Sequence, residues 1–145
     1  MAKHMISRRF EWDAAHRVTK HGGKCRNLHG HRYAAEVYVA SDDLDNVDRV
    51  VDFSVLKDLV GGWIDEKWDH GCVLCFEDLC LIDLCRRQGW KVHVLGYEPT
   101  AECLARELHQ VAATLLESKG LYVVSVDLWE TPNCKSTYPV PHDIT

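Results

Sequence analysis

Three histidines in the first quarter of the chain have the spacing of a metal site. His29 and His31 are separated by one glycine, and side chains at positions i and i+2 of an extended chain point to the same face. His16 ends the preceding predicted strand, where hairpin pairing can bring it alongside them. Three imidazoles that leave a fourth position open are typical of catalytic zinc, whereas structural zinc sites close with four ligands. The pattern therefore predicts a catalytic metal centre at His16, His29 and His31, with Zn²⁺ as the favoured ion.

Two further groups could move protons beside such a metal. Cys25 lies four residues before His29, between Lys24 and Arg26, and nearby cations or metals favour the thiolate form of cysteine. Asp69 and His70 are adjacent, and a histidine oriented by a carboxylate can shuttle protons near neutral pH. The alternatives are histidines that satisfy local hydrogen bonds and a polar pair that ends a helix. The nearby cysteine favours the catalytic interpretation of both groups.

The elements that must position these residues can be predicted from hydrophobic periodicity. Residues 6–18 and 31–40 read as two strands joined by a polar loop, with Tyr33, Ala35, Val37 and Val39 on one face of the second. The other predicted elements are helices at 52–68 and 99–119 and strands at 121–130 and 137–140. This ββααββ order predicts an α+β fold, a four-stranded antiparallel sheet with two helices on one face.

Composition narrows the possible classes of protein. The 145 residues fit one domain, 1–145, and 46% hydrophobic with 27% charged residues is typical of a globular protein. The net charge of -5 argues against a nucleic-acid partner, and no apolar stretch is long enough to cross a membrane. No apolar signal-peptide core follows the N-terminus, and seven cysteines at irregular spacing suggest free thiols. We therefore expect a cytoplasmic protein.

The segment 71–96 is the least legible, with short strands expected near 72–76 and 91–95. It holds a single Cys72-x-x-Cys75 motif, followed by Cys80 and Cys85. One such motif could mark a second zinc site or a redox pair. A zinc ribbon needs two correctly spaced pairs, so thiols that fill a small apolar subcore are the favoured interpretation.

Six segments together carry a resemblance to a known family. They are FEWDAAH (10–16), CRNLHGH (25–31), VDFSVLK (51–57), WDH (68–70), PTAE (99–102) and ET (130–131). They follow the order found in that family and span nearly the whole chain. The chain thus resembles the pterin synthases, the family that includes 6-pyruvoyltetrahydropterin synthase and 6-carboxytetrahydropterin synthase. In that family asparagine is usual where this chain has Glu98, and the segment 72–96 is longer here than in compact members.

The resemblance implies a role for each candidate residue. The three histidines would bind zinc, Cys25 would be the catalytic base, and Asp69 with His70 would complete a proton relay across a subunit interface. Glu130 would anchor the pterin ring, because a carboxylate can accept two hydrogen bonds from its donor edge. Without the resemblance, Glu130 would be interpreted as a surface charge at a strand end. The further pterin contacts that it implies are Thr100 and Thr131.

The resemblance also implies an assembly. The fold would be the tunnelling fold (T-fold), in which trimers close the sheets into a barrel and two trimers stack as a hexamer. Such a barrel removes the exposed edge strands of a lone sheet. The partners expected are therefore other copies of the chain and a small pterin substrate, with the active sites at subunit interfaces.

The spacing Cys25-x-x-x-His29-Gly-His31 is similar to that of the carboxytetrahydropterin branch of the family. That similarity implies zinc-dependent conversion of 7,8-dihydroneopterin triphosphate to 6-carboxytetrahydropterin, with release of acetaldehyde and triphosphate, on the route to queuosine and other deazapurines. A cation cluster for the triphosphate is expected at Lys20, His21, Lys24 and Arg26. The alternatives are pyruvoyltetrahydropterin formation, another pterin side-chain cleavage, or a pterin-binding protein without catalysis.

Overall fold

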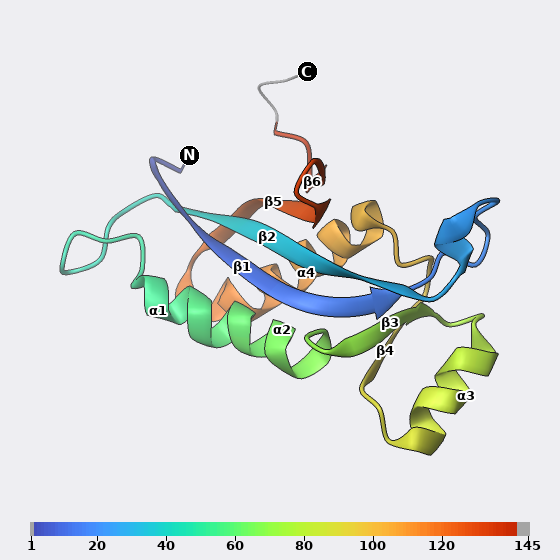
Figure 1. Ribbon diagram of the computed structural model, residues 1–145. Helices are drawn as coiled ribbons and strands as arrows, with labels where there is room; N and C mark the ends of the chain where they lie inside the picture. The colour runs from blue at the N-terminus through green and yellow to red at the C-terminus, as the bar shows by residue number, and fades with distance from the viewer. Residues whose placement is uncertain (1, 142–145) are drawn as a thin grey trace.

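The computed structural model describes residues 2–141 of the chain. Its described part is one mixed six-stranded sheet with strand order β4-β3-β1-β2-β5-β6. The two long helical segments pack on the same face of this sheet, and a third, shorter helix lies beyond its β3–β4 end (Figure 1). This arrangement is an α+β fold, as the element order predicts.

The central element is a long hairpin. β1 (His4–His16) and β2 (His29–Ser41) pair antiparallel over their full length, from His4 opposite Ser41 to His16 opposite His29. Trp12, Ala14 and His16 are buried at the end of β1, and the predicted set on β2 (Tyr33, Ala35, Val37 and Val39) is fully buried. The two strands and the loop between them are therefore confirmed, with the second strand beginning two residues earlier than predicted.

The first predicted helix is confirmed as one continuous segment with an irregular middle. It comprises α1 (Phe53–Leu56), a π-helical turn (Lys57–Gly61) and α2 (Gly62–Lys67). Asp52 caps its start by accepting a hydrogen bond from the Ser54 backbone N–H. A Cβ atom at Gly61 would lie 3.2 Å from Cε1 of Phe10, so this glycine allows the helix to approach β1 closely.

The C-terminal half of the chain also follows the expected order. α4 (Ala101–Leu116) continues as a 3-10 turn (Glu117–Lys119) and ends at Gly120, whose φ of 68° suits glycine. β5 (Tyr122–Thr131) pairs antiparallel with β2, and β6 (Cys134–Tyr138) pairs antiparallel with β5. The last strand begins three residues before its predicted start.

The prediction of a four-stranded, purely antiparallel sheet is wrong. β3 (Gly71–Cys75) pairs parallel with the end of β1, and β4 (Val92–Leu95) pairs parallel with β3. Helix α3 (Leu79–Gln88), which was not predicted, connects them, as parallel neighbours require a crossover. The short strands expected at 72–76 and 91–95 are confirmed. Their sequences are too short to predict which strands they pair with in the sheet.

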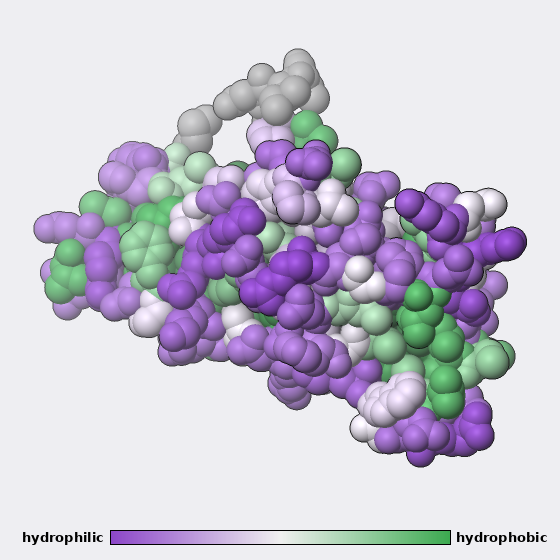
Figure 2. Space-filling view, viewed as in Figure 1, coloured by the Kyte–Doolittle hydropathy of each residue, from purple (hydrophilic) through white to green (hydrophobic). Residues whose placement is uncertain are grey.

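Two apolar clusters stabilise the described chain. The main core joins β1, β2 and β5 to both long helical segments and includes the buried Trp12, Trp68 and Leu108. A smaller cluster under α3 contains Cys85, with Cys72 packed against it, so these thiols do fill an apolar subcore. All seven cysteines are free. Apolar residues remain exposed over α3, among them Phe76 and Leu79 (Figure 2).

Candidate active site

The three predicted metal ligands converge at one end of the β1–β2 hairpin. His16 ends β1 opposite His29, and His31 lies opposite Ala14, so all three side chains leave the same face of the hairpin. Their ring centroids are 4.7 to 5.1 Å apart, and their ligand nitrogens lie within 4.8 Å of one another. This histidine cluster can therefore hold a metal ion.

The hydrogen bonds of the cluster leave its Nε2 atoms free for a cation. His16 Nδ1 donates to the carbonyl oxygen of Pro99 (2.8 Å), and His29 Nδ1 donates to that of Asn27 (2.7 Å). Because carbonyl oxygens only accept, each ring carries its proton on Nδ1 and a lone pair on Nε2. The two Nε2 atoms are 3.1 Å apart, a repulsive arrangement of lone pairs unless a cation lies between them.

His31 and the burial of the cluster support the same conclusion. The Nε2 atom of His31 is buried and has no hydrogen-bond partner among the described residues. Burial lowers the pKa of His16 and of His31, which favours the neutral imidazole that binds metals. Three nitrogen donors suit zinc, and the residues present therefore fit such an ion.

Glu130 joins the cluster from the C-terminal end of β5. Its Oε1 atom lies 3.4 Å from Nε2 of His16 and 3.8 Å from Nε2 of His31. The charge of the same carboxylate adds to burial in raising the pKa of Tyr33, whose buried hydroxyl has no hydrogen-bond partner in residues 2–141. Residue-level reasoning would leave Glu130 as a surface charge, because nothing in a strand-end glutamate indicates a contact with residues a hundred positions away. Only the family resemblance could have found it.

Cys25 lies in a short 3-10 helix (Lys24–Arg26) within the loop that joins β1 to β2. Its carbonyl oxygen accepts a hydrogen bond from the Val18 backbone N–H (2.9 Å), which ties it to the chain just after His16. Its side chain is half-buried and belongs to neither of the two groups in residues 2–141 that could hold a metal ion, which are the histidine cluster and Asp13 with Asp69 and His70. A nearby thiol that is not itself a ligand can serve as a base.

Two contacts hold the base of the Cys25 loop. Arg17 donates twice to the buried carboxylate of Asp78, at 2.6 and 2.7 Å. The backbone N–H of Thr19 donates to Glu98 Oε2 (2.9 Å), and the Thr19 hydroxyl donates to Glu98 Oε1. Glu98, the residue that departs from the family pattern, thus connects this loop to Pro99, whose carbonyl orients His16.

Asp69 and His70 form a second group in the turn after α2. His70 Nδ1 lies 2.9 Å from Asp69 Oδ1, and that oxygen also accepts from the Asp13 backbone N–H (3.1 Å). Although burial alone would raise it, the pKa of Asp69 is lowered by these hydrogen bonds and by the charges of His70 and Lys91. The Asp69 carboxylate therefore stays ionised at neutral pH and can orient His70.

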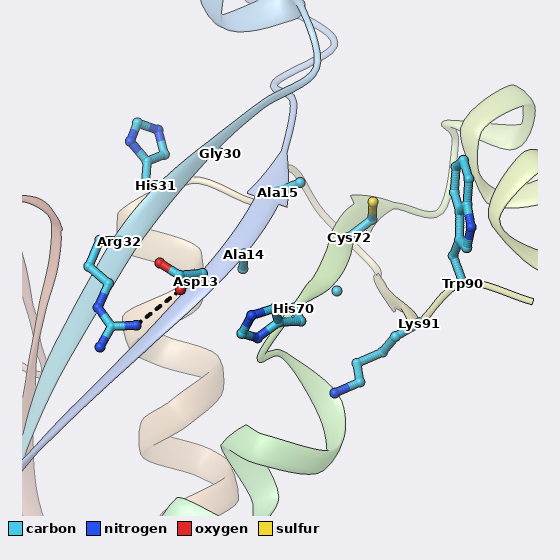
Figure 3. Close-up of a pocket in the computed structure, with 11 residues that line it drawn as sticks. Asp13, Ala14, Ala15, Gly30, His31, Arg32, His70, Cys72, Trp90 and Lys91 are labelled. Carbon is cyan, nitrogen blue, oxygen red and sulfur yellow. Dashed lines mark hydrogen bonds and ion pairs between the residues drawn. The ribbon is translucent and has the colours of Figure 1, made fainter.

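The second group lies on the other face of the hairpin from the histidine cluster. Alternation along β1 puts Asp13 on the face opposite Ala14 and His16, and side-chain atoms of Asp13, Asp69 and His70 lie within 4.8 Å. A pocket of about 550 Å³ opens over His70 on this face. His31 also borders the pocket, but its ring points away from that of His70 (Figure 3). Within one chain, the histidine cluster and the Asp69–His70 pair therefore lie on opposite faces of the hairpin.

The other residues predicted to contact the substrate do not form a single cluster as the three histidines do. Thr100 caps α4, because its hydroxyl accepts from the Cys103 backbone N–H (3.2 Å). Thr131 follows Glu130 directly and is half-buried. Lys24 and Arg26 are exposed on the Cys25 loop, where they could meet an anion. Lys20 lies 3.7 Å from the Glu77 carboxylate and is thus already paired with an acid.

Fold and site together define the class of this protein: an α+β protein with a three-histidine metal-type centre at the end of a β-hairpin. The chain belongs to the 6-pyruvoyl tetrahydropterin synthase family, whose model matches residues 5–140. The resemblance inferred from the sequence motifs is thereby confirmed, and the chain is a member of a family of pterin synthases.

Named relatives and solved structures agree with this membership. The chain is 42% identical to a 6-carboxy-5,6,7,8-tetrahydropterin synthase of Rickettsia bellii, over 88% of this chain and 94% of the relative. It is 36% identical to the protein of that name from Aquifex aeolicus, over 92% and 96%. Among solved structures, 6-pyruvoyl tetrahydropterin synthase of Caenorhabditis elegans has a TM-score of 0.68 at 21% identity, over 92% of this chain and 93% of that one. An uncharacterized protein of Wolinella succinogenes reaches a TM-score of 0.80 at 22% identity, over 92% and 96%. These two likenesses concern the fold.

Among residues 2–141, no helix has the length and apolar character needed to cross a bilayer.

Proposed function

We propose that this chain is a zinc-dependent carbon–carbon lyase that converts 7,8-dihydroneopterin triphosphate to 6-carboxytetrahydropterin, releasing acetaldehyde and triphosphate. The observation that carries the proposal is the histidine cluster. Two of its lone-pair nitrogens are 3.1 Å apart, and a third is buried with no hydrogen-bond partner in the described part of the chain. The branch of the family is supported by the relatives named 6-carboxy-5,6,7,8-tetrahydropterin synthase and by the cysteine spacing.

His16, His29 and His31 would hold the zinc ion through Nε2, with Pro99 and Asn27 fixing the first two rings. A bound zinc ion acts as a Lewis acid on oxygens of the substrate side chain. Glu130 would accept hydrogen bonds from the pterin ring, because its carboxylate faces the cluster from β5. A ring held there would place its side chain over the three histidines.

Proton transfer would then be divided between two groups. Cys25, whose backbone is hydrogen-bonded to Val18, two residues after His16, would remove a proton from the substrate side chain on one side. His70, oriented by the ionised Asp69 carboxylate, would move a proton on the other side. Lys24 and Arg26 are exposed next to Cys25 and would attract the triphosphate.

We further propose that each active site is shared between two chains of a homo-oligomer, a hexamer of stacked trimers. The support is that the Asp69–His70 pair and the histidine cluster of one chain lie on opposite faces of the same hairpin. A second copy would bring its His70 to the first copy's cluster. Association would also cover the open edges of β4 and β6.

The deciding experiment is incubation of the zinc-loaded protein with 7,8-dihydroneopterin triphosphate and identification of the products by mass spectrometry. We expect 6-carboxytetrahydropterin and acetaldehyde, and neither product from a Cys25→Ala variant that still binds zinc. Binding of the pterin without turnover would contradict the proposal and identify a pterin-binding protein.

A second candidate is formation of 6-pyruvoyltetrahydropterin on the same site. The description of the matching family favours it, since that description names the pyruvoyl reaction. The same incubation separates the two reactions, because the pyruvoyl product keeps the carbon atoms that otherwise leave as acetaldehyde. Formation of a pyruvoyl product would therefore be consistent with the proposed metal site but would contradict the carboxytetrahydropterin assignment.

A further inference from the structure

Lys91, at the entrance to β4, reaches across to the C-terminal end of α2. Its Nζ donates to the carbonyl oxygens of Asp65 (2.7 Å) and Asp69 (2.6 Å). Carbonyls at a helix C-terminus lack partners within the helix, and a cation there also interacts favourably with the helix dipole. Lys91 therefore caps the C-terminal end of α2 and also binds the backbone carbonyl of Asp69.

The aliphatic part of Lys91 packs against the residue that follows His70. A Cβ atom at Gly71 would lie 2.9 Å from Cδ and 3.0 Å from Cγ of Lys91. The Lys91 carbonyl oxygen also accepts from the Cys72 backbone N–H (3.0 Å). The lysine thus contacts the chain immediately before and immediately after His70, and Figure 3 shows it beside the turn that carries this ring.

His70 depends on contacts to its backbone as well as on the Asp69 carboxylate, which lies 2.9 Å from its Nδ1. Its φ is 59°, a left-handed conformation that is uncommon for residues other than glycine, and its side chain is 76% exposed. From the β1 side, its backbone N–H donates to the Asp13 carbonyl (2.7 Å). Lys91 supplies the opposing contacts from the β4 side. The position of the exposed ring therefore depends on the backbone of the turn together with the Asp69 carboxylate.

We propose that Lys91 is a positioning residue for the Asp69–His70 pair: its ammonium and stem hold the turn in the one conformation that aims His70 at the substrate. This inference rests on the proposed function, in which His70 transfers a proton. It also assigns a role to the segment 71–96, whose strand β4 brings the lysine to the turn.

The first test compares three zinc-loaded variants of the full chain. Lys91→Met removes the ammonium and keeps an unbranched stem over Gly71, while Lys91→Arg restores a cation. Lys67→Met is the matched control, because Lys67 lies in the last turn of the same helix and is exposed. We expect kcat to fall about 30-fold in Lys91→Met, with KM within about twofold, and to stay within about threefold of wild type in the other two.

A double-mutant cycle distinguishes positioning from general destabilisation. If Lys91 acts through His70, then Lys91→Met in a His70→Ala background should lower kcat by less than about twofold further. A further loss as large as in the wild-type background would overturn the proposal. So would a kcat of Lys91→Met equal to that of Lys67→Met.

A readout independent of activity separates this inference from the proposed function. Carbon-13 labelling at Cε1 of histidine gives one NMR cross-peak per ring, and the His70 peak is identified by its loss in His70→Ala. We expect this peak to move in Lys91→Met, not in Lys67→Met, while the cluster histidines keep their positions. An unmoved His70 peak overturns the inference even where the enzyme is active.

If the wild type makes no pterin product, the proposed function fails and the spectra still decide whether Lys91 positions His70. Should Lys91→Met not fold, Lys91→Gln, which retains a donor for one carbonyl, takes its place in every comparison.

Discussion

His16 and His29 face one another across the end of a β-hairpin with their Nε2 atoms 3.1 Å apart, while each Nδ1 donates to a backbone carbonyl. Two lone pairs held this close are stabilised only by a cation between them. The arrangement is built by strand register, because the two residues are direct partners in the hairpin. Strand register thus brings two of the proposed ligand nitrogens together, and removal of the proposed ion should have defined consequences.

Removal of zinc should abolish turnover and leave most of the fold intact. The main core joins the sheet to the long helices without using the three histidines, so the strands do not depend on the ion. We expect chelation to eliminate product formation, to leave the far-UV circular dichroism spectrum nearly unchanged and to lower the melting temperature, because a ligand of the native state stabilises it. Loss of the far-UV signal on chelation would instead show a structural metal.

Mixing Cys25→Ala with His70→Ala, each of which has low activity alone, should raise activity if the sites are shared between chains. Cys25→Ala and His70→Ala each remove one side of the proton transfer, yet one type of mixed interface contains both intact groups. With random exchange of subunits, about a quarter of the sites should recover, and the product rate should approach that fraction of wild type. A mixture that stays inactive although mass spectrometry shows mixed oligomers would place both groups in one chain.

Replacing Glu130 by glutamine should weaken pterin binding more than zinc binding. The carboxylate would accept charge-assisted hydrogen bonds from the pterin ring, each contributing about 1.5–3 kcal/mol, so kcat/KM should fall about 100-fold. Zinc content, measured by atomic absorption, should stay at the wild-type level. Exposed Glu66→Gln is the control. A variant that loses zinc but keeps its pterin affinity would assign Glu130 to the metal.

The ionised Asp69 should make stability depend on pH only in acid. Its folded pKa is lowered, so the unfolded chain binds the proton more readily. Its stabilising contribution is complete above the unfolded value of about 4 and is lost as the pH falls through the lower folded value. Urea unfolding between pH 3 and pH 7 should show a smaller acid loss in Asp69→Asn than in wild type. Equal acid losses would contradict this prediction.

Thr100 should contribute to stability through its cap on α4. Its hydroxyl accepts from the Cys103 N–H at the first turn of the helix. Thr100→Ala should therefore lower the free energy of unfolding by about 1 kcal/mol, whereas Thr100→Ser should keep most of it. Denaturant unfolding of the three proteins measures the difference. If alanine and serine behave alike, the cap contributes nothing measurable.

Local patterns in the sequence were sufficient to predict the hairpin, both long helices and the convergence of three histidines. Alternation along residues 31–40 indicates the buried face of β2, and His29-Gly-His31 places two rings on one side of it. Helical spacing predicts a buried stripe of Phe53, Leu56, Val60, Trp63, Ile64 and Trp68. All of these belong to or pack against the main core except Phe53, which is exposed. These elements can be predicted from short segments because the side of a strand or helix on which a side chain lies follows from the regular repeat of that element over a few residues.

The tertiary structure alone decided how distant segments meet. No pattern within 71–96 indicates that β3 joins β1 in parallel, that α3 crosses over, or that Lys91 caps a helix ending two dozen residues earlier. Likewise, Glu130 reaches the histidines, and His70 lies on the opposite face of the hairpin, only through the order of strands in the sheet. Such pairings depend on burial of the whole core and on completion of backbone hydrogen bonds between distant segments. They therefore cannot be predicted from any short stretch of residues.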